Sequence, residues 1–258
     1  METEPIVGPS DLRDAYARVH ERIADAASRA GRRPRDVVLV AVTKTATPDQ
    51  IRALVEMGQV DLAENRVQQL TQRVAQLDEY LSRRRALGGA VERETAAVPD
   101  RVRWHMIGHL QRNKVKQVVP VVELIHGVDS LRLAEELHNY AAKTDRVVDI
   151  LVQVNASGEV GKHGISPPAV GHLIEQIDTM VHVRARGLMT MAPYTGRAED
   201  SRGCFARTAE IFEEVCTEGL GGSDFNILSM GMSDDFEVAI EEGANVVRVG
   251  RALFGEER

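Results

Sequence analysis

The residue with the clearest chemical potential is Lys44, which follows an uninterrupted apolar run at positions 37–42. Four valines in six residues predict a strand buried on both faces, and residues 43–48 predict a polar turn and a helix that begins at Pro48. Such a strand would deliver one amine to its own C-terminal end, where a lysine can form a Schiff base. A solvated lysine without a chemical role is the alternative for this position taken alone.

The elements that must position this lysine are predicted from the spacing of apolar runs. An amphipathic helix is expected from about 11 to 30, and eight short apolar runs follow, each but the last preceding a helix-like segment. The runs lie near 37–42, 60–63, 102–107, 122–128, 147–154, 181–188, 225–229 and 245–249. Eight βα units predict an α/β fold, a single (β/α)8 barrel of the TIM type.

The 258 residues have the usual size of one such barrel, so we expect a single domain over 1–258 and no second β domain. An open doubly wound sheet is the alternative, but it would normally carry a glycine-rich phosphate turn where this chain has Thr43-Lys44-Thr45. The charge-rich stretch 78–101 shows no clear periodicity and is expected to be a surface insertion, either a disordered loop or an extended helix.

Polar residues are expected to collect at one mouth of the barrel, because active sites of βα barrels lie at the C-terminal ends of the strands. The residues that follow the first six predicted strands are Lys44, Asn65, His109, Asp129, Asn155 and Met189.

Two glycine-containing segments at the ends of the last two predicted strands are candidates for a phosphate site. In 229–235, Ser233 suits a helix N-cap and Gly231 allows close backbone approach. Free amides there would hold a phosphate, although a plain capped helix explains this segment equally well when it is taken alone. The segment 248–255 adds Arg248, Gly250 and further amides, which favours the phosphate site.

The sequence resembles a known family, the pyridoxal 5′-phosphate (PLP) homeostasis proteins of the YggS type. Members of this family share the barrel of the N-terminal domain of alanine racemase. The resemblance runs nearly end to end, and its segments occur in the order of the family. They are 41–44, 64–65, 104–108 with 110–111 and 113–114, 187–189, 229–235, and 248–250 with 254–255.

The resemblance implies that Lys44 carries PLP as an internal aldimine and that Arg248 faces the pyridine nitrogen. It implies that the phosphate is held by Ser233 and by the amides around Gly250 and Arg251. An arginine does not give up its proton, so the pyridine nitrogen should stay unprotonated and the cofactor should be a poor electron sink.

Contacts along the cofactor ring are expected from Asn65 and Ser229. The methionines after strands six and seven, Met230 among them, would either wall the cofactor pocket or fill the barrel core.

The chain departs from the family pattern at two of these positions. Arg66 stands where relatives usually have a tyrosine, and Arg251 stands where a small hydroxyl residue is common. Arg251 would either add charge to the phosphate site or turn outward. Lys162 resembles a loop lysine that accepts or releases the cofactor, with a solvated lysine as the alternative.

We therefore expect a non-catalytic protein that binds PLP covalently and reversibly for intracellular vitamin B6 homeostasis, either buffering the cofactor or delivering it to apo enzymes. An amino-acid racemase is one alternative, but it needs a second base, and Tyr194 in an exposed turn is the one tyrosine near the mouth. A lyase that forms its Schiff base with a sugar phosphate, without PLP, is the other. At most, weak promiscuous racemase activity is expected.

Composition and residue patterns exclude some classes of partner and some cellular locations. The net charge of −7 argues against nucleic acid, and no apolar run approaches 18 residues, so no membrane span is expected. Cys204 and Cys216 fall twelve positions apart in one predicted helix and should be free thiols, as in a cytoplasmic protein. The pair His105 and His109 lacks further ligands at a metal-like spacing, so no metal is expected. A barrel with an uncovered mouth is expected to be a monomer, and a dimer formed through the loops is the alternative.

Overall fold

The computed structural model describes residues 9–87, 99, 101–159, 161 and 163–255. Eight parallel strands form one closed barrel in chain order, with β1 paired to both β2 and β8. The strands are β1 Val38–Val42, β2 Asp61–Glu64, β3 Arg103–Met106, β4 Leu124–Val128, β5 Val148–Gln153, β6 Val183–Met189, β7 Ile227–Ser229 and β8 Val246–Val249. Each overlaps one of the eight predicted runs, so the prediction of a (β/α)8 barrel is confirmed.

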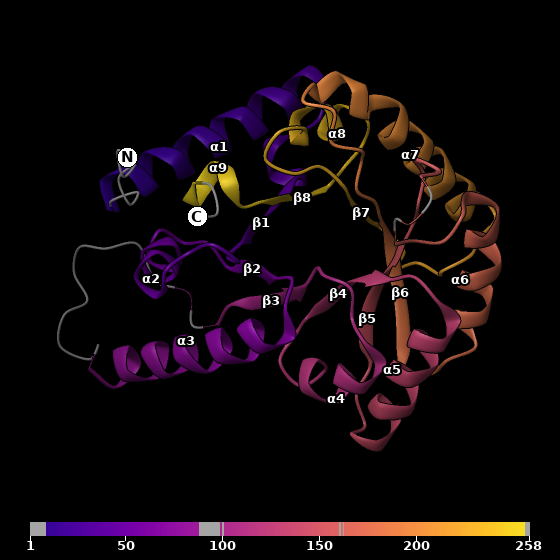
Figure 1. The fold of residues 1–258 in the computed structure, drawn as a ribbon, viewed down its shortest axis with the longest axis horizontal. Helices are drawn as coiled ribbons and strands as arrows, with labels where there is room; N and C mark the ends of the chain where they lie inside the picture. The colour runs from indigo at the N-terminus through magenta and orange to yellow at the C-terminus, as the bar shows by residue number, and fades with distance from the viewer. Residues whose placement is uncertain (1–8, 88–98, 100, 160, 162, 256–258) are drawn as a thin grey trace.

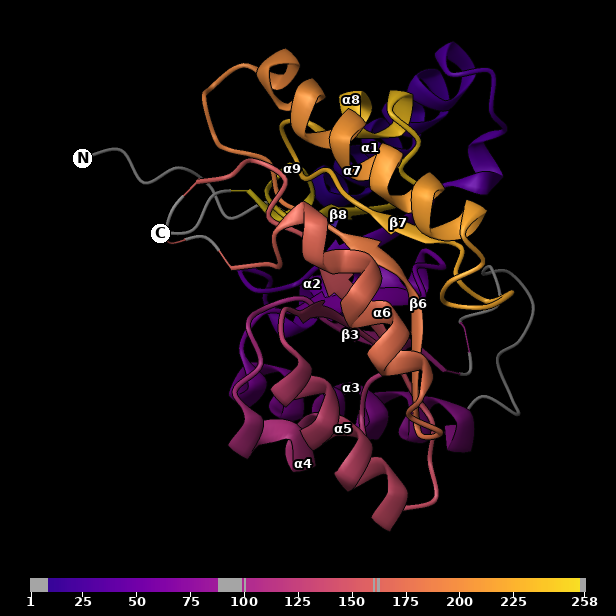
Figure 2. The ribbon, with the colours of Figure 1, turned by 90° about the vertical axis from the view of Figure 1, so that its right-hand side faces the viewer.

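Helices surround the strands (Figure 1). They are α1 Pro9–Arg29, α2 Pro48–Glu56, α3 Val67–Leu87, α4 Val115–Val118, α5 Leu131–Lys143, α6 Val170–Asp178, α7 Arg202–Thr217, α8 Phe236–Glu241 and α9 Arg251–Phe254. The turned view shows α6 and α7 covering the outer side of β6 (Figure 2). The expectation that no helix follows the last strand is wrong, because α9 begins two residues after β8.

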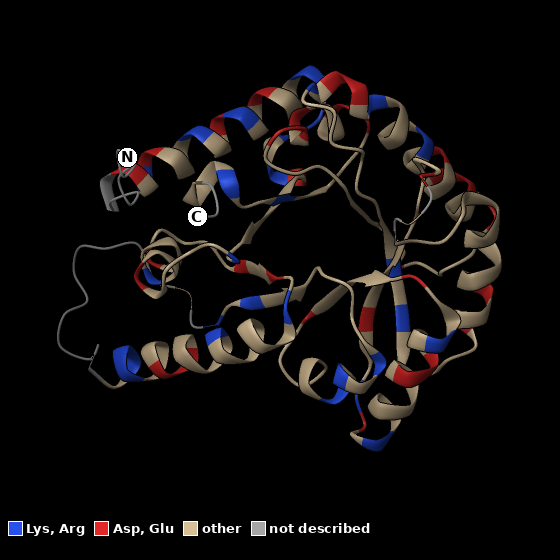
Figure 3. Cartoon of the chain, in the orientation of Figure 1, with Lys and Arg blue, Asp and Glu red and all other residues tan. Residues whose placement is uncertain are grey.

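The N-terminal helix α1 completes the ring by packing against α8, α9 and α2. Its apolar side chains Leu12, Val19 and Ile23 are buried in the main core, and Arg22 forms an ion pair with Glu237 of α8 at 2.8 Å. Charged residues of both signs are spread over the outer helices (Figure 3). Among the described residues, none of the helices combines the length and the hydrophobicity that crossing a membrane requires.

The structure describes part of the predicted insertion at 78–101. Residues 78–87 continue α3, which favours the extended-helix alternative for that part, while 88–98 and 100 lie outside the described residues.

Strand residues alternate between two different environments. In β1, Leu39 and Ala41 belong to the large core shared with the helices, whereas Val40 and Val42 belong to a small cluster inside the barrel. The barrel interior also contains buried polar side chains, which lie on the inward positions of their strands: Asp61, His105, His126, Ser229 and Arg248.

One glycine is required where two neighbouring strands approach unusually closely. Gly187 of β6 has a φ of 148°, and a Cβ atom built on it would lie 1.7 Å from the carbonyl oxygen of Ile227 in β7. No side-chain movement removes this overlap, because the clashing atom belongs to the backbone.

We predict that Gly187→Ala lowers the free energy of unfolding by about 3 kcal/mol, the sum of a steric overlap and an unfavourable φ. The matched control is Gly203→Ala in α7, where a Cβ would meet nothing within 4 Å. That change should be neutral or slightly stabilising. Urea unfolding followed by circular dichroism checks both, and equal stability of the two variants would contradict the register of β6 against β7.

Candidate cofactor-binding site

The predicted site residues come from strands that are neighbours in the barrel. Lys44 follows β1, Asn65 follows β2, and the segments 229–235 and 248–251 contain the ends of β7 and β8. Gly250 allows the last segment to approach β1, since a Cβ there would lie 3.0 Å from the carbonyl oxygen of Val42. The lysine turn and the amides after β8 are therefore adjacent at one side of the mouth.

The turn that carries Lys44 is fixed by an arginine that sequence reasoning missed. Arg73 of α3 donates to the carbonyl oxygens of Thr43 and, at 3.0 Å, of Ala46, on either side of the exposed Lys44. Arg73 also forms an ion pair with Glu64 at the end of β2. The backbone of the turn is thus held from outside the barrel while the lysine side chain remains accessible.

Glu64 is completely buried and receives hydrogen bonds from Arg73 and from the hydroxyl of Thr43. Burial raises the pKa of its carboxyl group, and this effect outweighs the opposing influence of the hydroxyl and the guanidinium. The acid joins the ends of β1 and β2 to α3. No local sequence signal links Arg73 to this site, because its partners lie on other elements.

The two loops after β7 and β8 meet at the hydroxyl of Ser233. Its Oγ accepts hydrogen bonds from the backbone N–H groups of Gly250 at 3.3 Å and Ala252 at 3.2 Å. The expectation that Ser233 caps a helix is wrong: the N-cap of α8 is Asp235, and Ser233 binds the start of α9 instead. The two amide N–H groups thus converge on the hydroxyl oxygen of Ser233, and converging backbone N–H groups of this kind are suited to binding an anion.

Asp235 takes over the structural role in that segment. It is buried and accepts hydrogen bonds from the backbone N–H of Met232 at 2.6 Å and from the hydroxyl of Ser201 at 3.3 Å. Burial raises the pKa of its carboxyl group. Arg251 forms an ion pair with Asp234, and its side chain is 41% exposed, so its charge is partly neutralised at the rim.

Arg248 lies inside the barrel behind this rim. Its guanidinium donates to the hydroxyl of Ser229 at 2.7 Å and to the carbonyl oxygen of Thr190 at 2.8 Å. These bonds use two of its five N–H groups. Burial lowers its pKa to about 10, against a smaller opposing influence of Asp235, so the group stays protonated at neutral pH.

Ser229 connects Arg248 to a row of hydrogen bonds across the barrel interior. Nδ1 of His126 lies 3.0 Å from the Ser229 hydroxyl, and its Nε2 lies 3.0 Å from Nδ1 of His105. Nε2 of His105 lies 3.1 Å from Asp61, which is also bound by two nitrogens of Arg103 at 2.6 Å each. The row joins β2, β3, β4, β7 and β8.

The donors and acceptors in this row follow from its ends. Asp61 only accepts when ionised, so His105 donates from Nε2; with both rings neutral, His105 accepts from His126 and His126 accepts from Ser229. Arg248 then donates to Ser229. Burial lowers the pKa of His126 well below its ordinary value, which keeps that ring neutral.

Several of the residues predicted to contact the cofactor do not lie on the surface of the mouth. Ser229 and Met230 are fully buried, and Met230 packs in the large core shared with the helices, not in the barrel interior. Asn65 is half-buried, and its Oδ1 atom is buried without a hydrogen-bond partner among the described residues. Tyr194 is 79% exposed, and Lys162 lies outside the described residues.

The pair His105 and His109 does not converge. His105 is buried in the hydrogen-bonded row, whereas His109 is exposed beyond the end of β3. Cys204 is buried and Cys216 exposed on the same helix, α7, and neither forms a disulfide bond, as expected.

The site thus lies in a closed parallel (β/α)8 barrel that carries a lysine after β1 and adjoining amide-bearing loops after β7 and β8. Residues 16–258 match the family described as alanine racemase, N-terminal domain. The chain is 39% identical over 249 residues to the pyridoxal phosphate homeostasis protein of Aquifex aeolicus, covering 95% of this chain and 98% of the relative. It belongs to the pyridoxal phosphate homeostasis protein family.

Other members support the same assignment. The pyridoxal phosphate homeostasis protein of Escherichia coli is 30% identical over 250 residues, covering 95% of this chain and 97% of the relative. The structure also superimposes on PipY of Synechococcus elongatus with PLP bound, with a TM-score of 0.71 and 32% identity. That alignment covers 90% of this chain and 100% of PipY.

The row of hydrogen bonds gives a pH prediction through Asp61. Burial alone would raise the pKa of Asp61, but the hydrogen bonds and charges of Arg103 and His105 outweigh this effect and lower the pKa below its ordinary value. A lowered pKa means that the ionised carboxylate contributes its full stabilisation above the pKa of the unfolded state, and that this contribution is lost as the pH falls through the pKa of the folded state.

We therefore predict that Asp61→Asn lowers the free energy of unfolding at neutral pH by about 2 kcal/mol. The difference from wild type should shrink as the pH falls below about 4. Urea unfolding at several pH values measures it, with Asp49→Asn as a control because that side chain is 89% exposed. A deficit that stays constant down to the lowest pH would contradict the lowered pKa.

Proposed function

We propose that this protein binds PLP covalently and reversibly at Lys44 and carries it for intracellular vitamin B6 homeostasis, without catalysing a reaction of its own. The observation that carries the proposal is the adjacency of three groups: the Lys44 turn, the amides gathered on Ser233, and the buried Arg248. The family and the PLP bound to PipY support the choice of cofactor.

The phosphate end is assigned to Ser233 and to the backbone N–H groups of the segment after β8. In this structure the Ser233 hydroxyl accepts from two of these amides. Each amide would donate to a phosphate oxygen when the cofactor is bound, and the hydroxyl would donate its own proton. Backbone donors do not depend on side-chain identity, so Arg251 in place of a small hydroxyl residue leaves them intact.

The ring end is assigned to Arg248 and Asn65. Arg248 is fixed by Ser229 and Thr190 and keeps N–H groups beyond those two bonds. A guanidinium donor opposite the pyridine nitrogen leaves that nitrogen unprotonated, which weakens the cofactor as an electron sink. The Oδ1 of Asn65 has no partner among the described residues, and it marks an acceptor that a hydrogen-bond donor on a bound ligand would satisfy.

Carriage fits these residues better than racemisation. Removing and returning an α-proton requires a base on each face of the substrate. Lys44 would be one of these bases. The described tyrosine nearest the predicted mouth, Tyr194, is the candidate for the second, and its 79% exposure leaves it without a fixed position. An accessible lysine on a turn with a fixed backbone suits the loading and release of PLP. The proposed recipients of the cofactor are therefore apo enzymes that use PLP. The proposed form of the protein is a monomer.

We predict that Lys44→Ala abolishes covalent attachment of PLP. Wild type mixed with PLP should develop a yellow absorption band, and borohydride should fix the cofactor to the peptide that contains Lys44, as mass spectrometry would detect. The control is Lys116→Ala, an exposed lysine on α4, which should behave as wild type. Attachment that persists in Lys44→Ala, or that maps to another lysine, would overturn the assignment. No attachment to wild type would instead favour the sugar-phosphate lyase.

A second prediction concerns the phosphate end. Ser233→Ala removes one hydroxyl donor and should weaken the binding of PLP about tenfold, the usual effect of losing a hydrogen bond to a charged group. Binding of pyridoxal, which has no phosphate, should stay unchanged. Titrating both ligands by absorbance provides the comparison within one variant, and equal weakening for both would show that Ser233 acts on the fold and not on the phosphate.

A further inference from the structure

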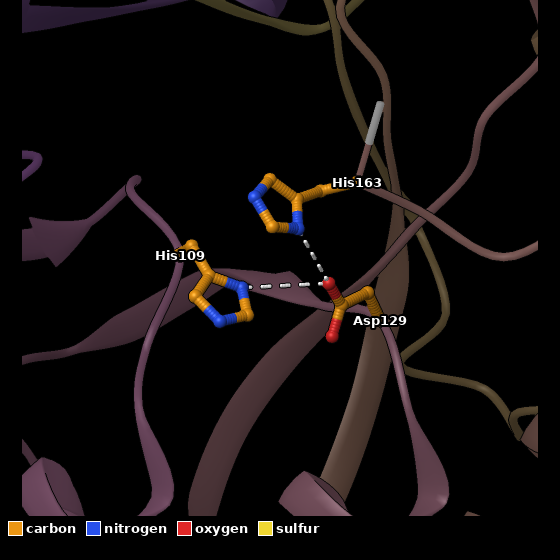
Figure 4. A group of neighbouring side chains, drawn as sticks. All are labelled: His109, Asp129 and His163. Atoms are coloured by element: carbon orange, nitrogen blue, oxygen red, sulfur yellow. Dashed lines mark ion pairs between the residues drawn. The ribbon is translucent and has the colours of Figure 1, made fainter. Parts of the chain in front are cut away.

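Three side chains from separate loops meet on the other side of the barrel mouth. His109 follows β3, Asp129 follows β4 and His163 lies in the loop after β5 (Figure 4). Nδ1 of His109 and Nδ1 of His163 each lie 3.5 Å from the same oxygen, Oδ2 of Asp129. The three potential ligand atoms all lie within 4.8 Å of one another.

We propose that His109, Asp129 and His163 bind one divalent metal ion that accepts nitrogen and oxygen ligands, such as Zn²⁺. This inference does not depend on the proposed PLP function, because none of the three residues belongs to the elements that carry Lys44 or the phosphate loops. In the closed strand order, β3 to β5 lie across the barrel from β7, β8 and β1.

The distances favour a metal over direct hydrogen bonds. An N–H···O bond spans about 2.7–3.2 Å between heavy atoms, so 3.5 Å is too long for either histidine to bind the carboxylate well. Ligands about 2.0–2.1 Å from a tetrahedral zinc ion stand about 3.4 Å from one another. The two nitrogen-to-oxygen distances are therefore close to those of a ligand set, and the two histidine ligand atoms lie within 4.8 Å of each other.

The side chains leave room for the adjustment that an ion requires. The two imidazole rings are stacked with centroids 4.3 Å apart at an angle of 17°, so they must tilt for both lone pairs to meet one ion. The side chains of His109 and His163 are 45% and 56% exposed, which permits this tilt, whereas Asp129 is only 14% exposed. The carboxylate is thus the fixed member of the set.

The backbone under the three ligands is held by close packing and by hydrogen bonds. A Cβ atom on Gly127 would lie 3.0 Å from the carbonyl oxygen of Gly108, so glycine there brings the ends of β3 and β4 together. The side chain of Gln153 donates to the carbonyl oxygen of His163 at 3.3 Å, and the N–H of Ile165 donates to the carbonyl oxygen of Gln153 at 2.7 Å. These contacts anchor the segment that carries His163 to β5.

The donor set selects the kind of ion. Two imidazole nitrogens and one carboxylate suit Zn²⁺, Co²⁺, Ni²⁺ or Cu²⁺, whereas Mg²⁺ and Ca²⁺ prefer oxygen ligands alone. Three protein ligands leave a fourth position for water or an exchangeable ligand. The expectation that the chain has no metal site rested on the spacing of possible ligands along the sequence, and these three residues are distant along the chain.

The test uses the full chain without an affinity tag and without PLP, because PLP itself binds metal ions. Zn²⁺ is titrated by competition with a chromophoric chelator, and Co²⁺ is added separately to record its visible spectrum. We expect one equivalent of each ion and the intense visible bands of tetrahedral cobalt. His163→Asn and Asp129→Asn should each weaken zinc binding at least tenfold, with thermal melts confirming that both variants fold.

The matched control is His172→Asn on α6, which removes an exposed histidine whose Nδ1 lies 3.6 Å from Glu175. It should leave zinc binding unchanged, because a single pair of surface ligands does not complete a site. Wild type that binds less than one equivalent, or affinities equal across wild type and all variants, would overturn the proposal.

Discussion

The interior of this barrel is organised by one row of hydrogen bonds that starts at the carboxylate of Asp61 and ends at the guanidinium of Arg248. An ionised acid at one end and an arginine at the other leave a single direction for the protons when the two histidines between them are neutral. Every member is buried, so a reversed bond would leave a polar group unsatisfied at a cost of about 1–3 kcal/mol. The row therefore determines how Arg248 is presented to the mouth.

The mouth itself is held together by contacts between elements that are distant in sequence. Arg73 and Glu64 brace the lysine turn from the α3 side, and Gly250 brings the amides after β8 against the end of β1. These contacts leave Lys44 exposed while its backbone is fixed. A fixed backbone with an accessible amine and a donor-only arginine favours attachment and release of a cofactor over proton transfer on a bound substrate.

The sequence predicts the barrel well because each strand overlaps a short, mostly apolar segment, and the order of these segments determines the order of the strands. Lys44, Ser233 and Gly250 could be found for the same reason, since they follow those segments directly. Arg73 and the partners of His105 could not, because their roles depend on the register between strands and on helix packing. The expected cap at Ser233 was wrong because Asp235, two residues later, binds the turn, and the Ser233 hydroxyl is drawn to the amides after β8. The group of His109, Asp129 and His163 likewise emerges only when three loops are placed side by side.

The central claim is that the buried row fixes Arg248 as a donor to the cofactor ring and so keeps PLP in a carrier state. The most direct measurement is the nitrogen-15 chemical shift of the pyridine nitrogen in labelled PLP bound to the wild-type protein. The account predicts the shift of an unprotonated, hydrogen-bonded nitrogen throughout the neutral pH range, because Arg248, with a pKa of about 10, does not release its proton there. The shift of a protonated pyridinium would contradict it, because the ring would then be activated as in catalytic PLP enzymes.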